Sequence, residues 1–399
     1  TKEEYISVSN AGVVTINNDM TLNENQVLGD LGGPSGSNNK WEIALQLVKD
    51  LDSQIDGKVT ILDGLDGIIG NAAIYNERFP DFRANLTTGE TRLEPSIAIA
   101  DDFTTVGVWQ EDVQSGAPID FDIKAQRFTN KGLPNGTLIN INTYTTNEQA
   151  KPRIAIDSSG NFVVTWKGEG TGDSEGIFAR RFNSSGTGLD ANEFLVNTAY
   201  TSGTQDNPKI VRSPSTGDFI IVWQSFEEEG GGQEEGIYAQ KYLSNGTTDG
   251  SSFHVNTYTT YSQSNPDIAL GASGKFITVW QSDQQDTSSS GIYGQMFNSS
   301  GTNGTEFPVN TTFSSDQRNP AVVMNVNDDS FVAVWQSDQS GVDFDIFAQM
   351  FKVNGTNITK SGSEFQVNTN TSDVQKNPQI VMDNDGNFTI FWESYLEDG

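Results

Sequence analysis

The chain has 399 residues, no cysteine, a single histidine and a formal net charge of −30 at pH 7. This composition excludes cysteine–histidine catalysis and histidine-rich zinc sites, and so acidic a surface disfavours nucleic acid and anionic membranes as partners. No stretch is apolar for about 18 residues, so we expect no membrane insertion. The length suits one large domain plus a smaller unit.

Residues 1–70 carry no internal repeat and are predicted to form a β-rich extension. Tyr5–Ser9 and Gly12–Ile16 read as a hairpin, and Gly57–Leu62 reads as a further strand. Trp41–Ile55 fits an amphipathic helix with a capping box or a half-buried strand, and its β-forming neighbours favour the strand slightly. The extension is expected either to pair with a sheet edge of another subunit, giving self-association, or to cap its own domain.

From residue 71 onward, a strand ending in tryptophan recurs six times. The intervals between these tryptophans are 57, 57, 57, 55 and 57 residues, which indicates one supersecondary unit copied in tandem. Each copy contains four apolar segments, such as Pro152–Ile156, Phe162–Trp166, Ile177–Phe182 and Phe194–Thr198, separated by Gly, Asn and Asp turns. The recurring tryptophans are Trp109, Trp166, Trp223, Trp280, Trp335 and Trp392.

Four strands in about 57 residues match the blade of a β-propeller, whereas an immunoglobulin-like sandwich needs about 100 residues per unit. The last copy stops after its tryptophan strand, and Ile74–Phe79 matches the third strand that it lacks. We therefore predict an all-β fold with a six-bladed propeller over residues 71–399. The sixth blade would be closed by Ile74–Phe79 and by a fourth strand within Phe82–Leu93, leaving no open blade edge.

The repeat resembles one found in large secreted and cell-surface proteins. The residues that carry the likeness are Asn207-Pro208, Phe219–Ser225, Gly236–Tyr242 and Phe253–Thr257. Proteins with similar repeats include bacterial adhesin-like and calcium-binding RTX-type proteins and surface proteins of some protists. The resemblance covers residues 72–399 and implies a secreted, surface-located protein with an adhesive or structural role; a chain that begins at Thr1 suits a processed product.

The resemblance supplies no catalytic motif, and the blades are nearly identical, so we expect a non-enzymatic module. It would be a subunit of a cell-surface or matrix filament joined through residues 1–70. The alternative is a lectin-like propeller in which the six tryptophans are stacking platforms for surface glycans between blades. The glutamines Gln110, Gln224, Gln281 and Gln336 would then be hydrogen-bonding partners of the sugar. Tryptophans in such strands more often fill the space between sheets, burying about 200 Å² or more.

Clustered aspartates offer candidate ligands for a structural calcium ion, the one cofactor considered. Hard cations need six to eight oxygen ligands, which carboxylates supply. No copy shows the full twelve-residue calcium loop with its terminal glutamate, and Asp and Asn favour turns in any case. The candidates are Asp120, Asp122, Asp343 and Asp345, which flank a phenylalanine before the third strand, and Asp383 and Asp385 in a turn.

Eleven Asn-x-Ser/Thr sequons occur, several of them in the turn after the third strand of a copy. These turns are where glycans would attach if the source glycosylates secreted proteins. Asn-Gly and Asn-Ser also form turns by themselves, so sequons arise there without glycosylation. The candidate sites are Asn135, Asn183, Asn245, Asn298 and Asn354.

Enzyme classes receive little support from the sequence. His254 occupies a variable repeat position, which is a poor place for a general base. A sialidase is disfavoured because Asp157–Trp166 has the wrong Gly-to-Trp spacing for an Asp box, and because Arg78, Arg127 and Arg180 occupy equivalent positions spread around the ring. A calcium-dependent hydrolase of lactones or esters at the central channel is a third alternative.

Overall fold

The computed structural model describes residues 6–8, 14–16 and 91–395, with short gaps at 113–119, 227–233, 272, 287–288, 299–300, 303, 340, 342 and 372. The chain divides into two compact units, Thr1–Arg83 and Ala84–Gly399. In the first, β1 (Ile6–Val8) pairs antiparallel with β2 (Val14–Ile16), as predicted. The predicted segments 41–55, 57–62 and 74–79, and the domain boundary at residue 70, lie outside the described residues.

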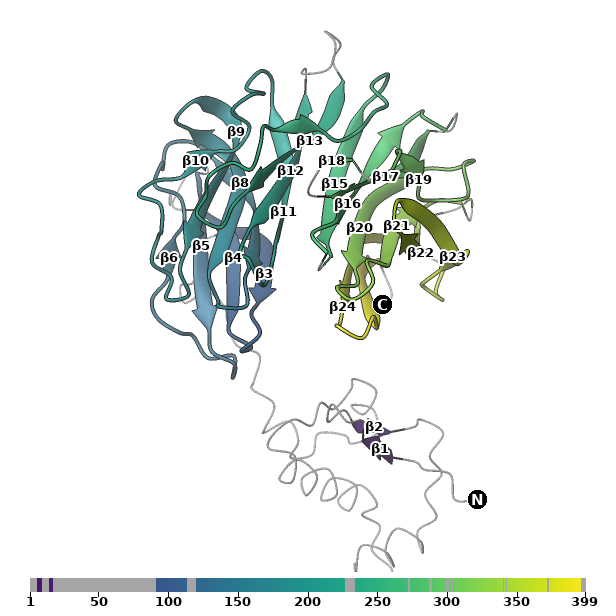
Figure 1. Ribbon diagram of the computed structural model, residues 1–399, viewed down its shortest axis with the longest axis horizontal. Helices are drawn as coiled ribbons and strands as arrows, with labels where there is room; N and C mark the ends of the chain where they lie inside the picture. The colour runs from purple at the N-terminus through teal and green to yellow at the C-terminus, as the bar shows by residue number, and fades with distance from the viewer. Residues whose placement is uncertain are drawn as a thin grey trace, which may run out of the picture. The chain divides into compact units, whose positions relative to one another are not determined.

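The second unit consists of antiparallel sheets that follow one another in chain order (Figure 1). The first strands are β3 (Arg92–Ile99), β7 (Gln149–Ile156), β11 (Gln205–Arg212), β15 (Gln263–Leu270), β20 (Gln317–Met324) and β24 (Gln375–Met382). The second strands are β4 (Thr105–Asp112), β8 (Phe162–Gly170), β12 (Phe219–Phe226), β16 (Phe276–Asp283), β21 (Phe331–Ser337) and β25 (Phe388–Ser394). The third strands are β5 (Phe121–Phe128), β9 (Asp173–Phe182), β13 (Glu235–Tyr242), β17 (Ser290–Asn298) and β22 (Asp345–Asn354). The outer strands are β6 (Ile139–Asn140), β10 (Phe194–Leu195), β14 (Phe253–His254), β19 (Phe307–Pro308) and β23 (Asn357–Gln366), and β18 (Gly301–Thr302) also pairs with β17.

The first strand of each sheet contacts the first strand of the next, so these strands form the inner layer of the unit. Sheets placed side by side with their first strands innermost are the arrangement of propeller blades. No helix occurs among residues 91–395 outside the gaps, and none of the described residues forms a helix that could cross a membrane.

Each inner strand is bulged just before its proline. Proline cannot donate a ladder hydrogen bond, so the register shifts there in all six sheets. The preceding residue adopts a left-handed conformation in every copy, which asparagine tolerates better than most residues. These residues are Glu94, Lys151, Asn207, Asn265, Asn319 and Asn377, with φ between 49° and 53°.

The hydrophobic core lies between neighbouring sheets and is built from the repeated aromatic residues. Trp166, Trp223, Trp280 and Trp335 have no exposed surface, and Trp109 is 6% exposed. Trp166 packs against Val106 and Val108 of the preceding sheet, for example. The indoles in these five sheets therefore fill the space between sheets. This agrees with the expectation that such tryptophans more often pack between sheets than serve as stacking platforms for sugars.

The last sheet differs from the others because its described part has only two strands, β24 and β25. Phe391 is 55% exposed and Trp392 is 37% exposed, whereas the residues equivalent to Phe391 in the other sheets are fully buried. On the first sheet, Ile97 is 72% exposed although its equivalent Ile154 is buried. The unit thus presents an uncovered apolar face at each end of the series of sheets.

A repeated hydrogen-bonded clasp joins neighbouring sheets. The carboxylate of Glu193 accepts bonds from the amide and hydroxyl of Thr143 in the preceding sheet, at 2.9 and 2.5 Å. Glu306 and Glu364 bind the equivalent threonines of their preceding sheets in the same way. Ser252 occupies this position in the β11–β14 sheet, so the junction between the β7–β10 and β11–β14 sheets has no such glutamate.

Candidate active site

A row of amide side chains lies at the bulged ends of the inner strands from β11 onward. Asn207 donates from Nδ2 to Oε1 of Gln224 at 2.9 Å and to Oδ1 of Asn265 at 3.1 Å. The same Gln224 oxygen accepts the backbone N–H of Asn265 at 2.9 Å. Asn319, Asn377 and Gln336 repeat this pattern. Gln110, Gln224 and Gln336 thus accept hydrogen bonds from the next sheet, a role that the lectin-like alternative did not assign to them. Gln281 instead accepts a hydrogen bond from Asn265 of its own sheet at 3.3 Å.

The β7–β10 sheet breaks this pattern, because Lys151 replaces the asparagine and Lys167 replaces the glutamine. The ammonium of Lys151 donates to both carboxylate oxygens of Asp206, at 2.8 and 2.9 Å, and to Oδ1 of Asn207 at 2.9 Å. Lys167 Nζ lies 3.8 Å from the same carboxylate. Lysine is less suited than asparagine to the left-handed backbone at position 151, so the charge is gained at some conformational cost.

Glu235 begins β13 beside this ion pair. Gln224 donates from Nε2 to its carboxylate at 2.9 Å. Burial raises the pKa of Glu235, the negative charges of Asp206 and Asp283 raise it further, and Gln224 and Lys151 oppose the shift only in part. A carboxyl group in this situation keeps its proton to higher pH than an exposed glutamate does.

Asp283 completes the group at the end of β16 in the next sheet. It accepts hydrogen bonds from the hydroxyl of Ser290 at 2.8 Å and from Nε2 of Gln281 at 3.4 Å. We call Asp206, Glu235 and Asp283 the acidic cluster. It combines an ion-paired carboxylate with a carboxyl group whose pKa is raised, the pairing that acid–base catalysis requires.

Sequence reasoning missed the acidic cluster because it treated the blades as equivalent. The signal was present in the repeat alignment, where Lys151-Pro152 replaces Asn-Pro and Trp166-Lys167 replaces Trp-Gln. The burial of Glu235 had no such signal, since the exposed Glu175 occupies the same repeat position.

The structure separates the candidate metal ligands. Asp122 and Asp345 are buried at the starts of third strands, whereas Asp383 and Asp385 lie in an exposed turn in which Asp383 accepts the amides of Asp385 and Asn387. Asp120 and Asp343 are half-buried. Among the described residues, no three acidic or histidine side chains are grouped closely enough to hold a metal ion by themselves.

The candidate glycosylation sites lie in turns or at strand ends. Asn245 and Asn354 are exposed, and Asn135, Asn183 and Asn298 are half-buried. Oδ1 of Asn183 accepts the amides of Ser185 and Thr187, which is the turn-forming role that competes with glycosylation as an explanation of the sequon.

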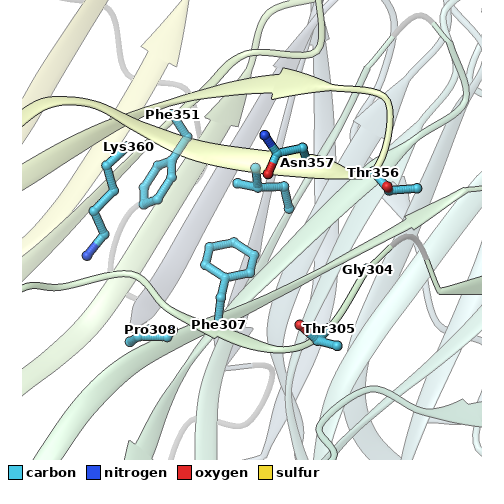
Figure 2. Close-up of a pocket in the computed structure, with 9 residues that line it drawn as sticks. Gly304, Thr305, Phe307, Pro308, Phe351, Thr356, Asn357 and Lys360 are labelled. Atoms are coloured by element: carbon cyan, nitrogen blue, oxygen red, sulfur yellow. The ribbon is translucent and has the colours of Figure 1, made fainter.

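Two cavities of about 380 Å³ lie between neighbouring sheets, at equivalent places in the repeat. Figure 2 shows one of them, where Phe307 points from its strand toward Phe351, with Lys360 at one end and Thr356 at the other. The second is lined by the equivalent Phe253 and, among others, His254. None of the six repeated tryptophans lines either cavity, and the five in complete sheets are too buried to stack on a sugar.

The two described arginines of the equivalent set serve the packing of sheets. Arg127 donates to the carbonyl of Ser185 and Arg180 to the carbonyl of Ile141, each in a neighbouring sheet. Arg78 lies outside the described residues.

No family model and no curated protein matches the chain. Among solved structures, the NanB sialidase of Streptococcus pneumoniae is similar with a TM-score of 0.51 and 8% identity, over 79% of this chain and 67% of the sialidase. An α-L-arabinofuranosidase of Fusarium graminearum gives 0.48 and 10%, over 74% of this chain and 85% of the enzyme. An α-L-arabinanase of Penicillium chrysogenum gives 0.42 and 12%, over 69% and 93%.

The similarity to the sialidase establishes a fold of the β-propeller type. These comparisons also overturn the prediction of a non-enzymatic structural or adhesive module, and with it the prediction that the chain is no enzyme. The sialidase is an enzyme built on this fold, so regular blades do not argue against catalysis. At such low identity the similarity concerns the fold, and any activity must be argued from the residues of this chain.

Proposed function

We propose that the chain hydrolyses a glycosidic bond at the acidic cluster. The observation that carries the proposal is the contrast between Glu235, whose pKa is raised, and the ion-paired Asp206. The β-propeller fold is compatible with such a site, and glycoside hydrolases use pairs of carboxyl groups in different protonation states.

Glu235 acts as the general acid. Protonated at working pH, it donates its proton to the oxygen that leaves the sugar as the glycosidic bond breaks. Asp206, ion-paired with Lys151, stabilises the positive charge that develops on the sugar ring, or accepts a proton from the attacking water. Asp283 raises the pKa of Glu235 without a direct part in bond breaking.

Glu235→Gln tests the proposal against a matched control, Glu175→Gln. Both residues lie two positions before the isoleucine of a third strand, but Glu175 is exposed and outside the acidic cluster. The substrates are aryl α-L-arabinofuranosides, arabinan and sialosides, the classes that the names of the similar enzymes indicate. We expect turnover to fall by about 10²–10⁴-fold in Glu235→Gln and to be unchanged in Glu175→Gln.

The pH dependence of the activity provides a second test, because a folding defect would not shift it in the expected direction. Activity that needs protonated Glu235 declines as pH rises through the raised pKa of this residue. Asp283→Asn removes a charge that raises this pKa, so the alkaline limb moves to lower pH. Equal activity of wild type and Glu235→Gln on every substrate that is turned over contradicts the proposal. An alkaline limb of the pH–activity profile that stays at the same pH in Asp283→Asn contradicts it as well.

We further propose that the propeller has six blades and that Ile74–Phe79 supplies the third strand of the last one. The two-strand sheet and the exposed Phe391 and Trp392 support this, because a third strand covers the equivalent edge elsewhere. By homology with β13, Arg78 would pair with Thr389. Since the chain has no cysteine, Arg78→Cys with Thr389→Cys should form a disulfide in air. Arg78→Cys with Ile390→Cys, one residue out of register, is the control and should remain reduced.

Secretion, glycosylation and self-association through residues 1–70 stay predictions. Secretion is supported by the abundance of Gly, Asn, Ser and Thr together with few Lys, a composition that suits an extracellular β protein. Mass spectrometry of the protein from its natural source, before and after removal of N-glycans, tests secretion and glycosylation together. Light scattering with and without residues 1–70 tests self-association.

A further inference from the structure

Asp345 is a buried carboxylate with one oxygen left without a partner. It opens β22 and is 1% exposed. Oδ1 accepts a hydrogen bond from Nδ2 of Asn368 at 2.7 Å, whereas Oδ2 is buried and has no hydrogen-bond partner among the described residues. An uncompensated carboxylate oxygen is costly to bury, and such groups are normally paired or bound to a metal. The acid–base chemistry proposed above does not use this residue.

The first sheet contains the same carboxylate with its charge compensated. Asp122 occupies the equivalent position, and its Oδ1 accepts from Nδ2 of Asn142 at 2.6 Å, as Asp345 does from Asn368. Its Oδ2 accepts from the ammonium of Lys124 at 3.3 Å. The two stretches differ by one residue, since Asp-Phe-Asp-Ile-Lys ends at Lys124 and Asp-Phe-Asp-Ile-Phe ends at Phe347. One sheet therefore supplies a cation to this carboxylate, and the other does not.

The surroundings of Asp345 are strongly acidic. Asp343 precedes it by two residues, and Asp338 follows the residue paired with Asp345 in β21. Oδ1 of Asp338 accepts the amide of Asp316 at 2.8 Å, and Arg318 is the cation paired with Asp316. A divalent cation bound there would compensate the buried charge as Lys124 does for Asp122, and hard cations take carboxylate oxygens as ligands.

We propose that Asp345, with Asp343, binds a calcium ion at the unpartnered Oδ2, so that the ion compensates this carboxylate as Lys124 compensates Asp122 in the first sheet. The described residues hold no group of three acidic side chains able to enclose a metal, so backbone carbonyls and water complete the coordination. The ion compensates the buried charge and thereby stabilises the β20–β23 sheet. Calcium is bound by the folded state and raises its stability by mass action.

Calorimetric titration and thermal unfolding of the metal-free protein test the proposal, with CaCl₂ as the probe. We expect one calcium ion per chain and a rise of several degrees in Tm. Asp345→Asn should abolish both effects, and Asp343→Asn should weaken the affinity. Asp122→Asn is the matched control, since its carboxylate is already paired with Lys124, and it should leave both effects unchanged. A wild-type protein that neither binds calcium nor gains stability overturns the proposal, as does a response that survives in Asp345→Asn.

Lys124→Phe tests the proposal by the gain of a second calcium site. It gives the first sheet the same five residues as the fifth and removes the ammonium from Asp122. We expect the stoichiometry to rise from one to two calcium ions per chain. A stoichiometry that stays at one contradicts the idea that calcium and Lys124 compensate the same carboxylate in different sheets. This result is independent of whether the acidic cluster hydrolyses sugars.

Discussion

The buried tryptophan layer between the sheets and the row of amide side chains at the inner-strand ends are built from the same repeat. The two regions differ in how strictly the residues of the repeat are conserved from one copy to the next. Between complete sheets, the tryptophan strand is nearly invariant and its indole is buried. At the inner-strand ends, the asparagine and glutamine of later sheets give way to Lys151 and Lys167, which face Asp206 where the second and third sheets meet. The uniform layer stabilises the fold, and the departures from uniformity mark the site of the proposed activity. Each of the following predictions breaks or sharpens this contrast.

The largest effect is expected in the uniform layer. Trp223→Ala removes a fully buried indole and should lower the free energy of unfolding by about 3–5 kcal/mol. Trp392→Ala, in the two-strand sheet, removes a partly exposed indole and should cost clearly less. Urea denaturation followed by circular dichroism measures both. Equal losses would mean that Trp392 is as well covered as the others.

Removing the glutamate clasp between the first and second sheets should have an intermediate effect on stability, and this effect should depend on pH. Burial alone would raise the pKa of Glu193, but hydrogen bonds from Thr143 and Tyr144 outweigh burial and lower it. Its contribution is therefore present above the unfolded-state pKa of about 4.3 and is lost as pH falls through the lower folded-state pKa. Glu193→Gln should cost about 1 kcal/mol at pH 7. Thermal unfolding at pH 7 and pH 3 should show this cost disappearing in acid.

Glu235 should show the opposite pH dependence. Its folded-state pKa is raised, so protonation favours the folded state at low pH, and stability is lost as pH rises through this pKa. Glu235→Gln should therefore raise Tm at neutral pH and leave it unchanged in acid, while abolishing the proposed activity. A variant that is less stable than wild type at neutral pH would contradict the assigned protonation state. Glu175→Gln again serves as the control.

The smallest effect is expected from restoring a clasp. Ser252→Glu places a glutamate where Glu193, Glu306 and Glu364 stand in other sheets. Because the position is half-buried and still reaches solvent, the gain should be about 0.5 kcal/mol. Differential scanning calorimetry resolves such a change when it is paired with Ser252→Gln, which keeps the size of the side chain without its charge. A gain in both variants would point to packing instead of the clasp.

The sequence predicted the repeat, its strands and the burial of the tryptophans, because these depend on local patterns that recur in every copy. It did not predict the acidic cluster, which is assembled from Asp206, Glu235 and Asp283 of two sheets and from Lys151 of a third. Raised pKa values arise from burial and from neighbours that are distant in the chain, and no spacing rule reports them. The sequence identified Asp345 only as one of six candidate aspartates. The structure was needed to show that Lys124 pairs with the buried Asp122, whereas Phe347 at the equivalent position cannot pair with Asp345.

The missing glutamate clasp between the second and third sheets has a mechanical consequence. Besides apolar packing, ion pairs hold this junction: Lys151 reaches Asp206 across it, and Arg212 forms a buried ion pair with Asp157 at 2.8 Å. Mobile ions screen the more exposed Lys151 pair, whereas the buried Arg212 pair is largely shielded from them. Rising salt should therefore weaken the Lys151–Asp206 pair and leave the Arg212–Asp157 pair, at the other end of the same two strands, in place. The junction would then loosen on the side where the acidic cluster lies, while the Arg212 pair holds the other side.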